Sequence, residues 1–333
     1  MTASVPPGSA FILAGPTASG KTDVAHLLAR EMGCEILSAD SMLVYRGMDI
    51  GTAKPEASLR AELRYHGLDL VDPGVPFSLS LYLEAASRAV AESRSGGRGL
   101  VVVGGTGLYI KALVEGVDDS PPADPALRAV WEARFAAEGV APLWRALREA
   151  YPALAASLTE SDRWNSRRLI RALELGAAGC VTVKRKWGGP SAIPPITALR
   201  LPMPLLRSRM ERRVRRMYAD GLLDEVRRLF KSGLENAPTA CQAIGYAEAI
   251  ACLSGSMSEA AAQAETILRT SQLAKRQMTW FRNQAQIRWI DLDRDLPAEA
   301  VADLVRAAWR ETGPIPICQT GQTGPTGPTG PTS

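Results

Sequence analysis

The sequence has few of the residues on which metal centres and disulfide frameworks depend. Its five cysteines are widely spaced and form no Cys-x-x-Cys pair, and its only histidines are His26 and His66. These features argue against a disulfide-stabilised fold, a zinc site and a Ser-His-Asp triad, and they favour a reducing, cytoplasmic location. No run of about 18 apolar residues occurs, and no basic segment opens the chain. We therefore expect neither a membrane span nor a signal peptide.

A large excess of charge of one sign is also absent. The 333 residues include 39 Lys and Arg against 35 Asp and Glu, which gives a net charge of +4. Apolar residues make up 46 % of the chain and charged residues 22 %, so a mainly disordered or fibrous protein is excluded. At roughly 150 residues per domain, the length predicts about two domains, each large enough to bury a core.

The segment Gly15–Thr22, GPTASGKT, matches the phosphate-binding pattern G-x-x-x-x-G-K-[ST]. An apolar run at 10–14 predicts a strand before it, and the pattern at 23–31 predicts an amphipathic helix after it. In this context backbone N–H groups surround a phosphate, and the helix N-terminus adds partial positive charge. We predict that Lys21 neutralises the distal phosphates and that Thr22 binds Mg²⁺. The motif alone indicates a phosphorylated ligand without identifying it.

Two more predicted strands end in polar or glycine-rich segments. Residues 35–38 are followed by Asp40, and residues 100–103 are followed by Gly-Gly-Thr-Gly, which contains Thr106. Strands that alternate with helices favour a parallel sheet, and ligands of such sheets bind at the carboxyl ends of the strands. We therefore expect the P-loop, Asp40 and Thr106 to lie at one edge of the sheet.

The chain is predicted to be an α/β protein, with a P-loop NTPase-like parallel sheet flanked by helices and a mostly helical insertion domain. Breaker residues at 121–125 and helical periodicity without strand signals after them indicate the insertion. Four regions follow from this interpretation: the first part of the core, the helical insertion, the completion of the core and a disordered Gly-Pro-Thr tail, at 1–117, 118–195, 196–312 and 313–333. The tail has a collagen-like period but too few triplets for a triple helix. Further elements are expected as helices at 81–92, 205–231 and 259–284, and strands at 197–201 and 286–292.

Positive charge is concentrated in two helical segments. Residues 163–186 contain seven basic side chains and one acidic one, and residues 207–231 contain nine basic against four acidic. Such segments are suited to nucleic-acid phosphates, although a solvated helix face has the same composition. Trp164 and Trp187 lie in the first segment and are candidates for base stacking, or for packing in the core or at its rim.

Taken together, five segments resemble the tRNA dimethylallyltransferase family, also called isopentenyl-diphosphate:tRNA transferases. In the order of the family they are GPTASGKT, SADSMLVYRGMDIGTAKP, VVVGGTGLYIKALVEG, QAIGYAE and AKRQMTWFR, at 15–22, 38–55, 101–116, 242–248 and 274–282. The P-loop occurs in many families, whereas the other four segments are specific to this one. The resemblance spans about 280 residues of the chain.

The resemblance implies a reaction and roles for the residues of the sheet edge. N6 of adenosine 37, beside the anticodon of tRNAs that read codons starting with U, attacks C1 of dimethylallyl diphosphate, and diphosphate leaves with the help of Mg²⁺. Asp40 matches the base that accepts the N6 proton, and Thr106, with Lys21, stabilises the leaving group. The implied diphosphate-binding residues are Gly15, Thr17, Ala18, Ser19, Gly20, Lys21 and Thr22, of which Thr22 also binds the metal.

The partners implied by the resemblance are dimethylallyl diphosphate and the anticodon stem-loop of tRNA, whose target base has to leave its stack. No membrane is involved, and we expect a monomer. The implied tRNA-binding residues are Asp40, Ser41, Met42, Leu43, Thr106, Arg128, Arg167, Arg168, Leu169, Ile170 and Arg171.

Three positions depart from the family pattern. Leu43 replaces a glutamine that would hydrogen-bond a base edge, Trp164-Asn165 replaces Asn-Asp, and Tyr65-His66 replaces a His-His pair. None of them belongs to the P-loop. Two alternatives remain open: an enzyme that acts on a free nucleotide or other small molecule, and a relative that binds tRNA without transferring the group.

Overall fold

A computed structural model describes residues 5–6, 8–117, 121, 123–182, 194–234, 237 and 239–317. The described chain forms two compact units. The first contains the described residues up to Val114 together with those from 194 to 317, and the second contains those from Glu115 to 182. The Gly-Pro-Thr repeats, Trp187 and the basic residues at 184–186 lie outside the described residues.

The first unit is built around the predicted parallel sheet, which is confirmed. Its strands lie in the order β3-β2-β4-β1-β5-β6, and all neighbours on this path are parallel. Their bounds are β1 (Ser9–Ala14), β2 (Glu35–Ser38), β3 (Tyr65–His66), β4 (Leu100–Gly104), β5 (Ile196–Arg200) and β6 (Ile287–Asp291). The central strands β1 and β4 are almost wholly buried, as continuous apolar runs in a parallel sheet require.

One short strand runs against this direction. β7 (Ile315–Pro316) pairs antiparallel with the start of β1. The predicted tail at 313–333 therefore begins too early. Ile315 is buried and hydrogen-bonded in the sheet, because an apolar Ile-Pro-Ile segment precedes the polar repeats.

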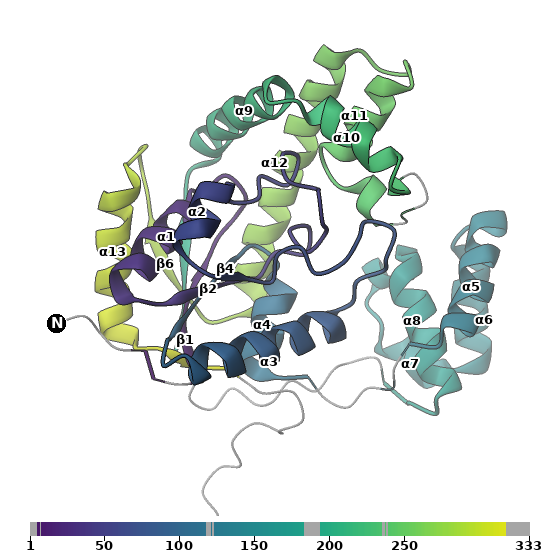
Figure 1. Cartoon of the computed structure of the whole chain (residues 1–333). Helices are drawn as coiled ribbons and strands as arrows, with labels where there is room; N and C mark the ends of the chain where they lie inside the picture. The colour runs from purple at the N-terminus through teal and green to yellow at the C-terminus, as the bar shows by residue number, and fades with distance from the viewer. Residues whose placement is uncertain are drawn as a thin grey trace, which may run out of the picture. The chain divides into compact units, whose positions relative to one another are not determined.

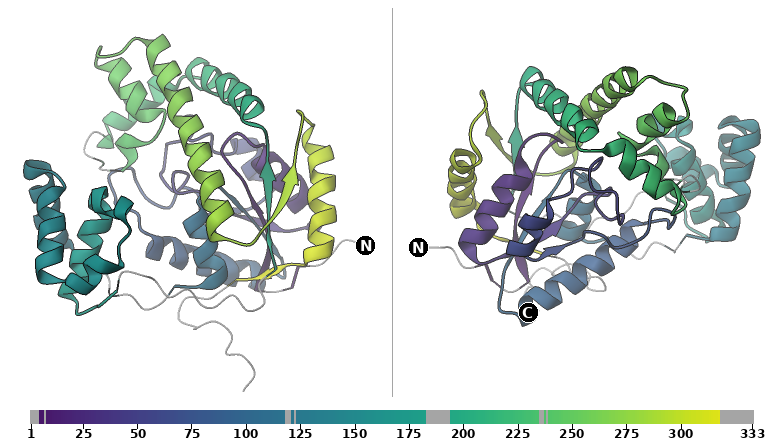
Figure 2. Two further views of the ribbon diagram at one scale, coloured as in Figure 1. Left: turned by 180° about the vertical axis from the view of Figure 1, so that it is seen from behind. Right: turned by 45° about the horizontal axis from the view of Figure 1, so that its top comes forward.

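Helices cover the sheet on both sides (Figure 1). α1 (Lys21–Met32) and α13 (Ala298–Thr312) pack together over the core, where Phe11 of β1 stacks on Trp309 with ring centroids 4.7 Å apart. α3 (Leu79–Ser95) and α4 (Gly107–Glu115) flank β4 in the sequence. The 26-residue helix α12 (Glu259–Gln284) lies on the side of the sheet away from α1 (Figure 2).

The helix expected at 205–231 is two helices, so this prediction is wrong in its middle. α9 (Met203–Ala219) ends before Gly221, whose φ of 97° is left-handed, and α10 (Leu222–Phe230) begins after it. Together with α11 (Tyr246–Leu253), these helices enclose a second apolar cluster. The small helix α2 (Ala57–Glu62) belongs to the segment between β2 and β3. It lies near α1, from which it is distant in the sequence (Figure 1).

In the residues that the structure describes, the second unit consists of helices, in agreement with the prediction of a mostly helical insertion. They are α5 (Pro125–Glu138), α6 (Ala141–Ala150), α7 (Pro152–Ser157), the 3-10 turn η1 (Glu160–Trp164) and α8 (Ser166–Ala177). Apolar residues of α6, α7 and α8 form its core. Across both units, none of the described helices has the length and apolar character needed to cross a membrane.

Candidate active site

The P-loop, Asp40 and Thr106 follow three adjacent strands of the first unit, β1, β2 and β4. After β1 the chain crosses to β2, on one side of the adjacent strands β1 and β4, and after β4 it crosses to β5, on their other side. The loops after β1 and β4 therefore run in opposite directions. This is the topological switch point at which open parallel sheets bind their ligands. The register, with Ala14 opposite Gly104 and Ser38 opposite Val103, brings the three strand ends level.

The P-loop has the backbone geometry of an anion-binding loop. Ala18 and Gly20 both have left-handed φ angles, 63° and 83°, which turn successive N–H groups to the same side. Gly20 also caps α1, and the first N–H groups of that helix have no acceptor within it. Lys21 donates from Nζ to Pro16 O at 3.2 Å, so its side chain folds back over the loop. The Ser19 Oγ is buried without a partner among the described residues, which suits a bound anion.

A cavity of about 840 Å³ opens beside the P-loop, within the first unit. Seven basic and four acidic side chains line it, and Arg209 and Arg213 of α9 are among the basic ones. Arg209 donates from Nη1 to Ser19 O at 2.9 Å and pairs with Asp295. Arg213 donates from Nη2 to Thr52 O at 3.1 Å. The cavity is therefore suited to an anionic ligand of several charges.

Burial changes the charge state of these cations. It lowers the pKa of Lys21 to about 8; Asp40 counters this shift, Arg213 adds to it and Asp23 opposes it. Burial also lowers the pKa of Arg213, against the attraction of Asp40 and Asp23. Two partly desolvated cations that are bonded to no carboxylate among the described residues favour an anion in this cavity.

We expect the affinity for inorganic pyrophosphate to fall as the pH rises through the Lys21 pKa of about 8. Lys21 is charged below this pKa and neutral above it, so an anionic ligand loses one cationic partner. Calorimetric titrations from about pH 6.5 to about pH 9.5 measure this fall against Lys21→Arg, which stays protonated throughout. Pyrophosphate itself titrates equally in both experiments, so the ratio of the two affinities isolates Lys21. A ratio independent of pH would contradict this account.

Asp40 lines a second, smaller cavity of about 50 Å³, whose lining also includes Lys21. Lys21, Thr22 and Arg213 line both cavities, whereas Asp40 and Leu43 line only the smaller one. The Asp40 Oδ1 accepts a hydrogen bond from the Met42 N–H at 2.9 Å, which fixes the carboxylate. A carboxylate thus stands next to the cations of the larger cavity, without an ion pair to them among the described contacts.

Thr106 holds the loop that follows Asp40. Its Oγ1 accepts from the Ser41 N–H at 3.0 Å, and its own N–H donates to Ala39 O at 3.1 Å. The hydroxyl proton has one long contact, 3.4 Å, to the Ser41 Oγ. The Thr106 hydroxyl is therefore positioned by the β2 loop while its proton remains available to a ligand.

Glycine is needed at the positions around Thr106 because other segments pack closely against the backbone there. A Cβ on Gly104 would collide with the Ala39 carbonyl, one on Gly105 with the Gln277 amide, and one on Gly107 with the Trp280 ring. Gln277 of α12 also accepts from the Thr17 N–H at 2.8 Å and donates to Gly105 O at 3.1 Å. One side-chain amide thus joins the P-loop to the loop that carries Thr106.

In the second unit, two of the predicted tRNA-binding arginines surround a buried carboxylate. Arg128 forms a bidentate pair with Glu174, at 2.8 and 2.9 Å. Arg171 lies 3.3 Å from the same carboxylate and donates to Pro121 O at 2.5 Å. The hydrogen bond to Glu174 raises the pKa of Arg128. Part of the charge of both arginines is therefore used inside the unit.

The turn between η1 and α8 presents the other basic residues. Arg168 pairs with the buried Asp162, and Asn165 caps α8 by accepting from the Arg168 N–H at 3.2 Å. Trp164 is 76 % exposed, so the alternative that it packs in the core is wrong. The exposed Arg167 makes no ion pair among the contacts of the described residues.

Two predicted tRNA contacts need correction. Leu169 and Ile170 are buried in the core of the second unit together with Leu143, Leu147 and Leu154. In α8 they point away from the arginines at neighbouring positions because the helix is strongly amphipathic. Their side chains therefore support the fold and are not available to RNA.

Three residues of the site were missed in the sequence analysis. Arg209 and Arg213 belong to the segment 207–231, which was interpreted as an RNA-binding or solvated helix face, yet they line the P-loop cavity. Gln277 stands in the segment AKRQMTWFR, which carries the family resemblance, but nothing in its spacing indicates a contact with the P-loop. The repeated Arg at four-residue spacing in α9 was the only available signal for Arg209 and Arg213.

The chain matches one family model, and it is similar in sequence to proteins named tRNA dimethylallyltransferase. The family model described as IPP transferase matches residues 43–284. A tRNA dimethylallyltransferase of Geobacter sulfurreducens is 41 % identical over 285 residues, which cover 84 % of this chain and 91 % of the relative. A tRNA dimethylallyltransferase of Methylibium petroleiphilum is 43 % identical over 302 residues, with 87 % and 91 % covered.

Solved structures resemble the whole fold. A tRNA isopentenylpyrophosphate transferase of Bacillus halodurans is 33 % identical, with a TM-score of 0.64, and the match covers 92 % of this chain and 98 % of that one. A eukaryotic dimethylallyltransferase acting on tRNA has a TM-score of 0.68 at 21 % identity, with 92 % and 80 % covered. At that identity, the second likeness concerns the fold alone.

Proposed function

Because the chain belongs to the IPP transferase family, we propose that it transfers a dimethylallyl group from dimethylallyl diphosphate to N6 of adenosine 37 in tRNAs that read codons starting with U. The observation that carries the proposal is the position of Asp40. Asp40 lines the smaller cavity together with Lys21 and Arg213, and both of these cations also line the larger cavity. A base and a diphosphate site side by side are what transfer to an amine requires.

The larger cavity is the proposed donor site. Lys21, the N-terminus of α1 and the hydroxyl of Ser19 face the diphosphate, with Arg209 and Arg213 closing the other side. These groups stabilise the negative charge that develops on the diphosphate as its bond to C1 breaks. Because they are held by the fold before the ligand arrives, they need little reorganisation during the reaction.

Asp40 and Thr106 are the proposed groups at the reacting atoms. The lone pair of an exocyclic adenine amine is delocalised, so N6 attacks C1 effectively only as its proton passes to an acceptor, and Asp40 accepts it. The Thr106 hydroxyl donates its proton in a hydrogen bond to the leaving oxygen. The new N6–C1 bond replaces the C1–O bond, and the electron pair of that bond leaves on the diphosphate.

The residues at the P-loop fit a Mg²⁺ ion bound together with the diphosphate. Thr22 lies in the first turn of α1 and lines both cavities, and no group of three His, Cys, Asp or Glu side chains suited to a metal occurs in the part of the chain that the structure describes. Mg²⁺ commonly takes one or two protein ligands and completes its shell with phosphate oxygens and water. When bound, it adds positive charge beside the leaving diphosphate.

The second unit is the proposed binding surface for the anticodon stem-loop. Arg167 and Trp164 are exposed on one capped turn, and Arg128, Arg168 and Arg171 lie on the same unit. Phosphates attract the arginines, and an exposed indole stacks on an unpaired base. We further propose that the protein works as a monomer in the cytoplasm, where one tRNA molecule supplies the partner surface.

Single-turnover transfer tests the proposed function. The protein is mixed with Mg²⁺, labelled dimethylallyl diphosphate and unmodified tRNA that carries A at positions 36 and 37, with AMP as a parallel acceptor. We expect label in tRNA and none in AMP, which would also show that Leu43 is tolerated in place of glutamine. Label in AMP would favour an enzyme for free nucleotides. Binding of tRNA without transfer would favour a relative that has lost the reaction.

A further inference from the structure

The loop Asp49–Lys54 forms a wall shared by the two cavities. Asp49, Ala53 and Lys54 line the larger cavity, and Thr52 and Ala53 line the smaller one. Ala53 has a left-handed φ of 50°, which a residue with a Cβ adopts only when the surrounding structure holds it. The contacts that hold this wall loop therefore determine the shape of both cavities.

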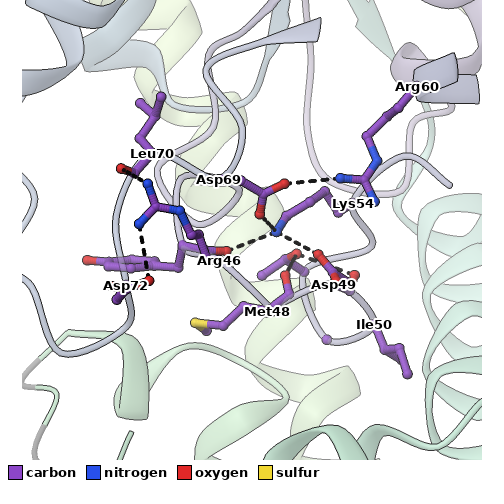
Figure 3. Close-up of polar contacts among 12 residues, drawn as sticks. Arg46, Met48, Asp49, Ile50, Lys54, Arg60, Asp69, Leu70 and Asp72 are labelled. Atoms are coloured by element: carbon purple, nitrogen blue, oxygen red, sulfur yellow. Dashed lines mark hydrogen bonds and ion pairs between the residues drawn. The ribbon is translucent and has the colours of Figure 1, made fainter. Parts of the chain in front are cut away.

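One contact comes from Lys54, whose side chain is fully buried (Figure 3). Its Nζ lies 2.6 Å from Asp49 Oδ1 and 2.6 Å from Asp69 Oδ1, and it donates to Tyr45 O at 2.9 Å. Arg60 binds the other oxygen of Asp69 at 3.0 Å. This cluster closes the wall loop on itself and joins it to the segment that precedes α3.

A second contact comes from Glu225 of α10, which is only 3 % exposed. Its carboxylate accepts from three consecutive N–H groups of the wall loop, Asp49 at 3.1 Å, Ile50 at 2.9 Å and Gly51 at 3.3 Å. The Tyr246 hydroxyl donates to it at 2.5 Å. Four donors converge on one carboxylate, and three of them belong to the wall loop.

The wall loop in turn contacts a cation of the larger cavity. The Thr52 carbonyl, directly after these three N–H groups, accepts from Arg213 Nη2 at 3.1 Å. This is the only side-chain hydrogen bond from Arg213 among the described residues, and Arg213 lines both cavities. The position of the wall loop therefore determines the orientation of the Arg213 side chain.

We propose that Glu225 is a positioning residue of the donor site, which holds the wall loop so that the Thr52 carbonyl directs Arg213 to the diphosphate. This inference rests on the proposed function for the identity of the donor, but its central contact, between Arg213 and a diphosphate, is measurable without transfer. Glu225 itself does not reach the ligand. It acts through Arg213, and its removal should cost ligand binding only while Arg213 is present.

Binding of inorganic pyrophosphate with Mg²⁺ tests the proposal. Glu225→Gln keeps the shape of the side chain but leaves one acceptor oxygen and turns an NH₂ group toward N–H donors, so the wall loop has to shift. We expect about 10-fold weaker binding of pyrophosphate and a fall of at least the same size in kcat/KM for dimethylallyl diphosphate, because Arg213 contacts the diphosphate both in the bound donor and as the C1–O bond breaks. Arg213→Ala should weaken binding at least as much, and the double variant no further, because both changes remove one interaction.

Glu248→Gln is the matched control. Glu248 is also 3 % exposed, accepts from the Gly245 N–H at 2.7 Å and pairs with Arg269. It is next in sequence to Ala249 of the same apolar cluster, and no contact among the described residues joins its carboxylate to the wall loop. It should lower the melting temperature as Glu225→Gln does and bind pyrophosphate like the wild type. If Glu225→Gln unfolds the protein, Glu225→Asp keeps the charge and shortens the reach, and it should show a smaller loss of the same kind.

Two results would overturn the proposal. One is wild-type affinity in Glu225→Gln or, if that variant unfolds, in Glu225→Asp; the other is a double variant whose loss equals the product of the two single losses. A failure of the proposed function has a different signature: the wild type would then bind pyrophosphate with the expected dependence on Glu225 but would not transfer the dimethylallyl group to tRNA.

Discussion

We expect Asp40→Asn to lower the single-turnover rate of transfer by about 10³-fold, with the affinity for tRNA within about 2-fold of the wild type. The amide keeps the acceptor that the Met42 N–H uses, at 2.9 Å in the structure, so the loop after β2 should not move. What it removes is the ability to take a proton from N6. The measurement is the rate of label transfer at saturating enzyme, with tRNA and pyrophosphate affinities determined separately.

A carboxylate elsewhere in the first unit provides the control for Asp40→Asn. Asp72 is exposed, pairs with Arg46 at 3.1 Å and lines neither cavity, so Asp72→Asn should transfer at the wild-type rate. If Asp40→Asn also transferred at the wild-type rate, Asp40 would not be the base. If it lost pyrophosphate affinity in proportion to rate, its role would be to balance the charge of Lys21 and Arg213.

The sheet and its edge were predictable because local patterns determine them. Continuous apolar runs identify β1 and β4, and the glycine and hydroxyl residues after them mark the strand ends. The break within 203–230 was harder to predict, since Gly221 is one glycine in an otherwise periodic Arg-rich pattern. The two-residue strands β3 and β7 have too few residues for any alternation to be visible.

The site was predictable where one motif supplies it and not where the tertiary structure brings segments together. Lys21 and Thr22 follow from the P-loop, and Asp40 and Thr106 follow from strand ends with the family resemblance. The contact of Gln277 with Thr17 spans 260 positions, and that of Arg213 with Thr52 spans 161. The spacing of residues in the sequence does not predict such a contact, because the contact depends on how α9 and α12 pack in the folded unit.

The second unit illustrates the same limit for charge. A count of basic residues treats Arg128, Arg167 and Arg171 alike, but Arg128 and Arg171 pair with the buried Glu174. Glu174 would be costly to bury alone, so its arginines are held in place whether or not RNA is bound. Arg167 is exposed and has no such partner in the described residues, so it is the clearest candidate for a phosphate contact.

We expect Arg167→Glu/Arg168→Glu to weaken tRNA binding by about 10²-fold at low salt. Each lost phosphate contact lowers the slope of log K against log salt concentration by ~0.7 to ~0.9, so two contacts should lower it by ~1.4 to ~1.8. Filter binding over a range of salt concentrations measures both quantities. Transfer at saturating tRNA should stay near the wild-type rate, because neither residue belongs to the P-loop unit.

Two further variants make this result interpretable. Reversing Arg168 places a second carboxylate beside the buried Asp162, so the turn could be disturbed, whereas Arg167→Glu alone leaves that pair intact. The single variant should show about half of the change in slope. Arg94→Glu makes the same change of charge on the exposed last turn of α3, which precedes the amino end of β4, and it should leave the slope unchanged. Equal losses in Arg94→Glu and Arg167→Glu would mean that net charge alone attracts the tRNA, and that this turn is not the contact surface.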